Sequence, residues 1–186
     1  ATPSGPADWS AHQVGPLGNT NTLPWGDFAQ EFNGRLCFSY SREFGFGTFR
    51  PMFCRALTDQ PASDSEWAIH EIVVGSGGGS LGLQEIQGRP VVLISYKATG
   101  QSVRPWMAFA NSPTPSSASS WKLMPLGNRT TWGGPLLLME GRPVIVAIGP
   151  TQFDGETHDV LMARAAAPWA DRADLWREEF CLGIPA

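Results

Sequence analysis

Lysine and long apolar runs are scarce in this sequence, and each scarcity excludes a class of protein. Only two lysines, Lys97 and Lys122, accompany eleven arginines, and 13 basic residues against 17 acidic ones leave a net charge of −4. Such a charge provides no electrostatic surface for nucleic acid, so no nucleic-acid partner is expected. No apolar run approaches the roughly 18 residues that a membrane helix needs, so no membrane span is expected.

The sequence also lacks the residue spacing of a metal site. Its three cysteines and three histidines are scattered and form no C-x-x-C pair, so we expect neither a metal nor another cofactor. Cys37 and Cys54 are predicted on adjacent antiparallel strands, and two alternatives stay open for them: a cross-strand disulfide or two buried free thiols. The opening residues 1–9 resemble a mature end left after signal removal, which predicts an exported protein, extracellular or periplasmic.

Glycine, proline and tryptophan, by contrast, are abundant. The 21 glycines and 16 prolines make up about a fifth of the 186 residues, which indicates many loops, while 42% hydrophobic residues suffice for a packed core. Segments with helical periodicity are nearly absent. The stretch 165–179 is the one candidate, and because Pro168 interrupts it we expect a loop that ends in a strand. The sequence therefore predicts an all-β fold.

Two landmarks recur along the chain with a common period. A Gly-Arg pair occurs at residues 34–35, 88–89 and 141–142. A tryptophan follows each pair, at Trp67, Trp121 and Trp176. The spacings are 54 and 53 residues for the Gly-Arg pairs and 54 and 55 for the tryptophans. Because two independent features keep one period, we infer an internal repeat.

Each repeat is predicted to contain four short strands. In the second repeat, apolar segments at 81–86 and 91–96 flank the turn signal Gln87-Gly88. The corresponding turn of the first repeat is Asn33-Gly34, a dipeptide that favours positive φ and a tight type I′ connection. We treat residues 1–186 as one domain. Its repeats are placed at about 20–74, 75–127 and 128–183, with residues 8–16 as the outer strand of a preceding unit.

Four-stranded antiparallel units of about 50 residues, each with a tryptophan at the start of the outer strand, resemble the blades of a β-propeller. A Gly-Arg-Pro followed by an apolar strand resembles the sialidase-type, or BNR-type, repeat. The Asp box of those repeats, Ser-x-Asp-x-Gly-x-x-Trp, is degenerate here, because the residues before Trp67 are Ser63-Asp64-Ser65-Glu66. The resemblance implies a segment of about three blades plus one leading outer strand.

Three blades are fewer than the roughly 4–8 of closed propellers. An open wedge would expose apolar blade faces, which soluble monomers rarely tolerate. We therefore expect either self-association or another chain that completes the ring.

Strand reversal gathers the connections between second and third strands, and those between repeats, on one face of such a segment. Loops on a rigid scaffold are where binding groups concentrate. Aromatic rings beside carboxylates and guanidiniums suit a sugar, although the tryptophans of these loops have packing between blades as an alternative role. The candidate ligand residues on this face are Trp25, Asp27, Arg42, Glu43, Arg104, Trp132, Asp154 and Glu156.

A sialidase-like mechanism, as the resemblance implies it, needs an arginine cluster, a tyrosine nucleophile with a glutamate partner, and an aspartic acid. The chain has only two tyrosines, and the three repeated arginines are expected at the face opposite the ligand loops. We assign no catalytic residue. The sequence predicts a non-catalytic binding or assembly module, lectin-like or protein-binding, with a glycoside hydrolase of sialidase type and an architectural subunit of a larger complex as alternatives.

Overall fold

The computed structural model describes residues 28–45, 48–74, 78–98, 103–126, 134–150 and 158–184. These residues form three four-stranded antiparallel sheets, each within one repeat of the sequence. The first contains β1 (Phe28–Phe32), β2 (Arg35–Glu43), β3 (Phe49–Ala56) and β4 (Trp67–Glu71). The second contains β5 (Gly78–Ile86), β6 (Arg89–Tyr96), β7 (Arg104–Ala110) and β8 (Trp121–Pro125). The third contains β9 (Leu136–Met139), β10 (Arg142–Pro150), β11 (His158–Ala165) and β12 (Trp176–Ile184).

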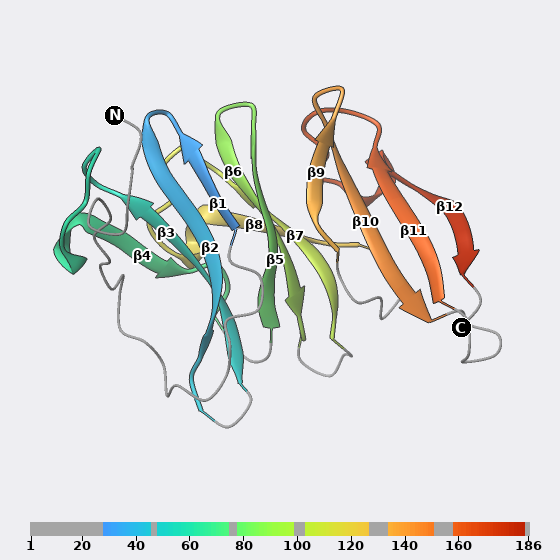
Figure 1. Ribbon diagram of the computed structural model, residues 1–186, viewed down its shortest axis with the longest axis horizontal. Helices are drawn as coiled ribbons and strands as arrows, with labels where there is room; N and C mark the ends of the chain where they lie inside the picture. The colour runs from blue at the N-terminus through green and yellow to red at the C-terminus, as the bar shows by residue number, and fades with distance from the viewer. Residues whose placement is uncertain are drawn as a thin grey trace, which may run out of the picture.

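In each sheet the strands pair with their neighbours in chain order, and the three sheets follow one another in a row (Figure 1). The predicted all-β class and the three four-stranded antiparallel units are confirmed. The predicted outer strand at 8–16 lies outside the described residues. Within the part of the chain that is described, no helix is long and apolar enough to span a bilayer.

The hairpin between the first two strands is the same in all three sheets. Asn33 and Gly34 have φ values of 49° and 71°, as a type I′ turn requires, which confirms the turn prediction. The equivalent pairs, Gln87-Gly88 and Glu140-Gly141, share this conformation, with φ of 52° and 73° and of 52° and 71°. A two-residue turn with positive φ at both positions matches the twist of the flanking strands, so the local sequence sets the register of each hairpin.

The connection between the third and fourth strands also repeats. In the first sheet a single 3₁₀ turn at Asp64–Glu66 is closed by a hydrogen bond from Glu66 N to Ser63 O (3.1 Å). The same bond is made by Ser120 and Leu175 in the other sheets. After each turn a tryptophan begins the fourth strand, opposite an alanine of the third strand. These alanines, Ala56, Ala110 and Ala165, are almost completely buried.

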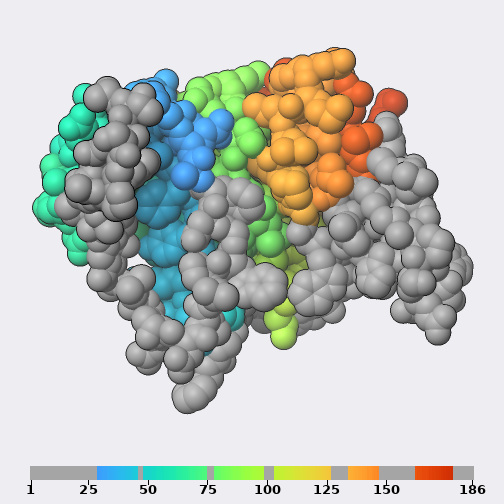
Figure 2. Space-filling view, in the orientation of Figure 1, coloured from blue at the N-terminus to red at the C-terminus, as the bar shows by residue number. Residues whose placement is uncertain are grey.

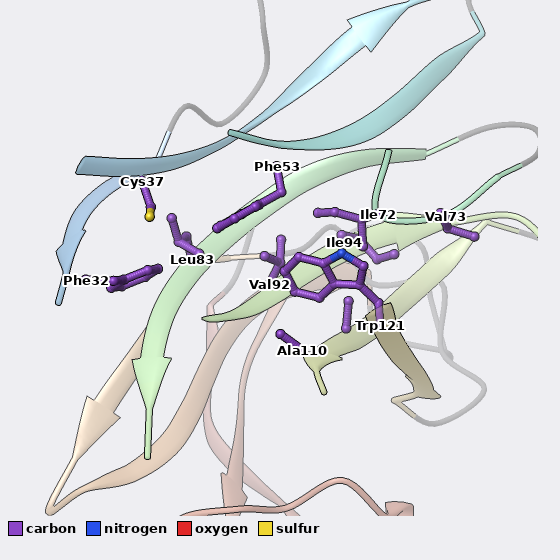
Figure 3. Close-up of a cluster of buried hydrophobic side chains, with 11 residues drawn as sticks. Phe32, Cys37, Phe53, Ile72, Val73, Leu83, Val92, Ile94, Ala110 and Trp121 are labelled. Atoms are coloured by element: carbon purple, nitrogen blue, oxygen red, sulfur yellow. The ribbon is translucent and has the colours of Figure 1, made fainter. Parts of the chain in front are cut away.

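The first and second sheets pack face to face through apolar side chains. Cys37, Phe53 and Ile72 of the first sheet meet Leu83, Val92 and Trp121 of the second in one buried cluster (Figure 3). The rings of Phe53 and Trp121 meet edge to face, with centroids 5.3 Å apart. Trp121 is only 7% exposed, so this repeated tryptophan packs between the two sheets.

A second cluster joins the second and third sheets. Val91, Leu93 and Met107 of the second sheet pack with Leu136 and Ile145 of the third. The regions of the three sheets adjoin along the upper edge of the space-filling view (Figure 2). The second sheet therefore packs against the first sheet with one face and against the third sheet with the other.

Cys37 and Cys54 are free, buried thiols, so the disulfide alternative is wrong. The register explains why: Cys54 pairs with Phe38, whereas Cys37 pairs with Arg55. Residues paired across antiparallel strands point to the same side, and neighbours along a strand alternate. The two thiols consequently point to opposite faces of the first sheet and cannot meet.

Candidate functional site

The connections β2–β3 and β6–β7 lie at the same end of the molecule, the lower end in Figure 1, which we call the ligand end. The strand end at Glu71 and the strand start at Gly78 lie there too, because successive strands reverse direction. The hairpins that carry the repeated arginines lie at the opposite end (Figure 1). The predicted separation of the arginines from the ligand loops is therefore confirmed for the described residues.

Glu43 and Arg104 lie on faces that the first and second sheets turn toward each other. Glu43 and Cys37 are an even number of residues apart on β2, so their side chains lie on the same face of the sheet. The side chain of Cys37 packs against the second sheet. Arg104 pairs with Tyr96, which packs on the same inter-sheet cluster. A carboxylate and a guanidinium are thus both directed into the space between the two sheets at the ligand end.

Aromatic rings border Arg104. Its guanidinium carbon is 5.1 Å from the ring centroid of Trp106, within the range of a cation–π contact. Tyr96 meets Trp106 edge to face, with centroids 5.6 Å apart. All three residues are partly exposed. The arrangement provides a positive group held against a flat aromatic surface.

A seam of serines joins the two sheets just inside the ligand end. Ser80 Oγ donates to Ser39 Oγ (2.6 Å), and Ser80 N donates to Ser41 Oγ (2.9 Å). Ser39 and Ser80 are fully buried, and Ser41 is 7% exposed. A Cβ added at Gly79 would lie 2.7 Å from Ser41 Oγ, so the strands approach too closely for a larger residue. The seam fixes the separation of the sheets next to Glu43 and Arg104.

Arg42, the neighbour of Glu43, points to the other face of the first sheet. It pairs in register with Arg50, and the two guanidinium carbons lie 4.7 and 4.1 Å from the ring centroid of Phe44. Arg50 also forms an ion pair with Glu71 (2.7 Å). The structure therefore brings Glu43 and Arg104 toward one space and places Arg42 outside it.

The other five predicted ligand residues lie outside the described residues; they are Trp25, Asp27, Trp132, Asp154 and Glu156. Among the described residues, no group of three or more His, Cys, Asp or Glu side chains is placed to hold a metal ion. Sequence reasoning overlooked the serine seam, although Ser39 and Ser41 are two residues apart on one strand and so share a face.

His70 is a second feature that the sequence did not reveal. Trp121 Nε1 donates a hydrogen bond to His70 Nε2 (3.1 Å) across the first inter-sheet contact, so the proton of a neutral imidazole sits on Nδ1. Burial lowers the pKa of His70 below its ordinary value of 6.5. The neighbouring sheet therefore partly covers this histidine of the outer strand.

No protein-family model and no curated protein sequence matches the chain. Among solved structures, the chain is similar to an α-L-arabinofuranosidase from Lactobacillus brevis, with a TM-score of 0.59 and 13% sequence identity. The match covers 89% of this chain and 57% of the arabinofuranosidase chain. The chain therefore shares the fold of somewhat more than half of that protein.

Proposed function

We propose that the three sheets are consecutive blades of a β-propeller with repeats of the sialidase or BNR-like type. The chain would serve as an exported, non-catalytic module that binds carbohydrate at the ligand end. Two features support the blade arrangement: each sheet packs face to face on the next, and the same hairpin, 3₁₀ turn and tryptophan recur in every sheet. Radial packing of this kind covers both apolar faces of a four-stranded sheet.

The observation that carries the ligand proposal is that Glu43 and Arg104 lie on the faces that the first and second sheets turn toward each other, with Arg104 beside Trp106. A sugar offers an apolar C–H patch that stacks on an aromatic ring and hydroxyl groups that pair with planar carboxylates and guanidiniums. These chemical requirements are met by side chains from two sheets. The five predicted ligand residues outside the described part belong to the same proposal.

The similarity to a protein named as an α-L-arabinofuranosidase supports the choice of a carbohydrate and makes arabinose-containing oligosaccharides the first probes. The same similarity favours the alternative that the chain is part of a glycoside hydrolase. A third alternative is an architectural subunit without a small ligand. Binding and turnover measured on one preparation separate the three.

The test is calorimetric titration of the full chain with arabinose-containing oligosaccharides, beside hydrolysis of a nitrophenyl α-L-arabinofuranoside. Saturable binding without turnover is expected. Glu43→Gln and Arg104→Lys should each weaken binding about 10- to 100-fold, because each removes a charge-assisted or bidentate hydrogen bond. Arg35→Lys is the matched control, since Arg35 pairs with Asp59 at the opposite end, and it should bind normally.

Turnover by the wild type that is lost in Glu43→Gln would show that the chain is an enzyme and would refute the non-catalytic binding module. Absence of binding to any oligosaccharide, together with a stable complex with a different protein, would favour the architectural role. Equal affinity in wild type, Glu43→Gln and Arg104→Lys would overturn the assignment of the ligand end.

A further inference from the structure

The strand β9 exposes apolar side chains that a strand in its position should bury. Leu137, Leu138 and Met139 are 40%, 39% and 46% exposed. This strand begins the third sheet, as β1 and β5 begin the first and second. The repeat allows its residues to be compared with their equivalents, counted back from the hairpin turn.

The residue before the turn is Phe32 in the first sheet, Ile86 in the second and Met139 in the third. Phe32 is 2% exposed and packs in the cluster shared with the second sheet. Ile86 is 3% exposed and packs in the cluster shared with the third sheet. This position therefore contacts the following sheet, and Met139 occupies it with 46% of its surface exposed.

The position two residues before Phe32, Ile86 and Met139 is occupied by Gln30, Gln84 and Leu137, respectively. Gln30 Oε1 accepts a hydrogen bond from Glu85 N (3.2 Å), and Gln84 Nε2 donates one to Leu136 O (3.1 Å). Each glutamine thus holds the first strand of the following sheet. Leu137 takes this position in the third sheet as an exposed apolar residue. Leu137 cannot make that hydrogen bond, so the outer face of the third sheet, which we call the acceptor face, offers apolar contact at Leu137 and Met139 instead. Val144, which pairs with Leu137 on this face, is already buried within one copy.

The first sheet carries the complementary half. On the first strands, Leu83 and Leu136 are 4% and 2% exposed because each packs against the preceding sheet. Their equivalent in the first sheet is Ala29, which is exposed, and Leu36 on the same face is 44% exposed. We call the part of this face around Ala29 and Leu36 the donor face; Met52 and Cys54, farther along the same face of the sheet, are already buried within one copy.

Charge also fits the two faces. Glu31 lies on the donor face and Arg142 on the acceptor face, and both side chains are exposed. Opposite charges on two surfaces favour their association and fix its direction.

We propose that the acceptor face binds the donor face of a second copy of this chain. Two such contacts close a ring of six sheets, a number within the roughly 4–8 blades of propellers. The contact is head-to-tail, because the faces that meet are different, and it closes into a ring of two copies when the three sheets of one copy span half a turn. The inference uses the blade arrangement proposed above and is independent of the ligand.

The first experiment measures the mass of the full chain in solution by light scattering or sedimentation. A species of about twice the chain mass of 20.1 kDa is expected. Leu137→Asp with Met139→Asp should return it to the single-chain mass with an unchanged circular dichroism spectrum, since both residues are exposed within one copy. Leu57→Asp is the matched control: Leu57 is 49% exposed but lies between β3 and β4, so the double mass should persist.

The second experiment tests the direction of the contact by cross-linking. Leu136 of the third sheet lies against Gly82 of the second, where an added Cβ would be 2.8 Å from Leu136 Cβ. The equivalent pair between copies is Ala29 and Pro135. Mixing Ala29→Cys chains with Pro135→Cys chains should give an intermolecular disulfide that neither variant forms alone.

Three results would overturn the proposal. The first is a single-chain mass for the wild type at the highest soluble concentration. The second is a double mass that survives Leu137→Asp with Met139→Asp, and the third is a disulfide that Pro135→Cys forms with itself, since either would place the contact elsewhere. Because glycan binding is measured separately at the ligand end, failure here leaves the proposed function standing or falling on its own data.

Discussion

The buried serine seam provides the sharpest test of how the first two sheets are held together. Ser80→Ala removes the hydroxyl that donates to Ser39 Oγ at 2.6 Å, and both residues are fully buried. Ser39 then loses its partner in a place that water does not reach, which should cost about 1–3 kcal/mol of unfolding free energy. For a chain of this size that corresponds to a fall in Tm of roughly 2–12 °C.

The double variant Ser39→Ala with Ser80→Ala makes the test quantitative. Removing both hydroxyls leaves no unpaired buried oxygen, so the double variant should cost no more than either single one. Urea unfolding of wild type, both single variants and the double variant gives the coupling energy. Ser65→Ala, which removes an exposed hydroxyl, is the control and should change stability by less than about 0.5 kcal/mol. Strictly additive costs, or single variants as stable as the control, would refute the reasoning.

Three further predictions concern other buried groups. Because burial lowers the pKa of His70, the unfolded chain binds a proton more readily, so unfolding free energy should fall as pH drops below about 6.5, and less steeply in His70→Gln. A profile unchanged in His70→Gln would contradict this. Burial raises the pKa of the Cys37 and Cys54 thiols to about 12, so peptide mapping should find both alkylated at pH 8 in urea and unmodified in the native chain. Gly82→Ala should lower the free energy of unfolding by about 1–3 kcal/mol, because the added Cβ would lie 2.9 Å from a backbone nitrogen of the third sheet. An unchanged midpoint of urea unfolding would show that the two sheets can move apart without cost.

Much of the architecture could be predicted from the sequence because the features that specify it are local. The Asn33-Gly34 turn needs positive φ at two adjacent residues, and such a turn fixes the hairpin register without help from the rest of the chain. The period of the Gly-Arg pairs and tryptophans then predicted three copies of one sheet.

The candidate site was predictable only in part, because the sequence places residues in a loop without saying which face they take. Arg42 and Glu43 are adjacent and were predicted together, yet the alternation of the strand sends them to opposite faces. The pairing of Cys37 with Arg55, one residue away from Cys54, likewise decided that no disulfide forms.

The sequence by itself therefore determined the number of sheets, the turns between their first two strands and the end of the molecule where the repeated arginines lie. Only the tertiary structure decided which side chains meet between sheets, such as Ser80 with Ser39 and Trp121 with His70. The physical reason is that turn geometry depends on neighbouring residues. A contact between sheets depends instead on the register of strands about 40 or more residues apart, where a shift by one residue turns every side chain to the opposite face.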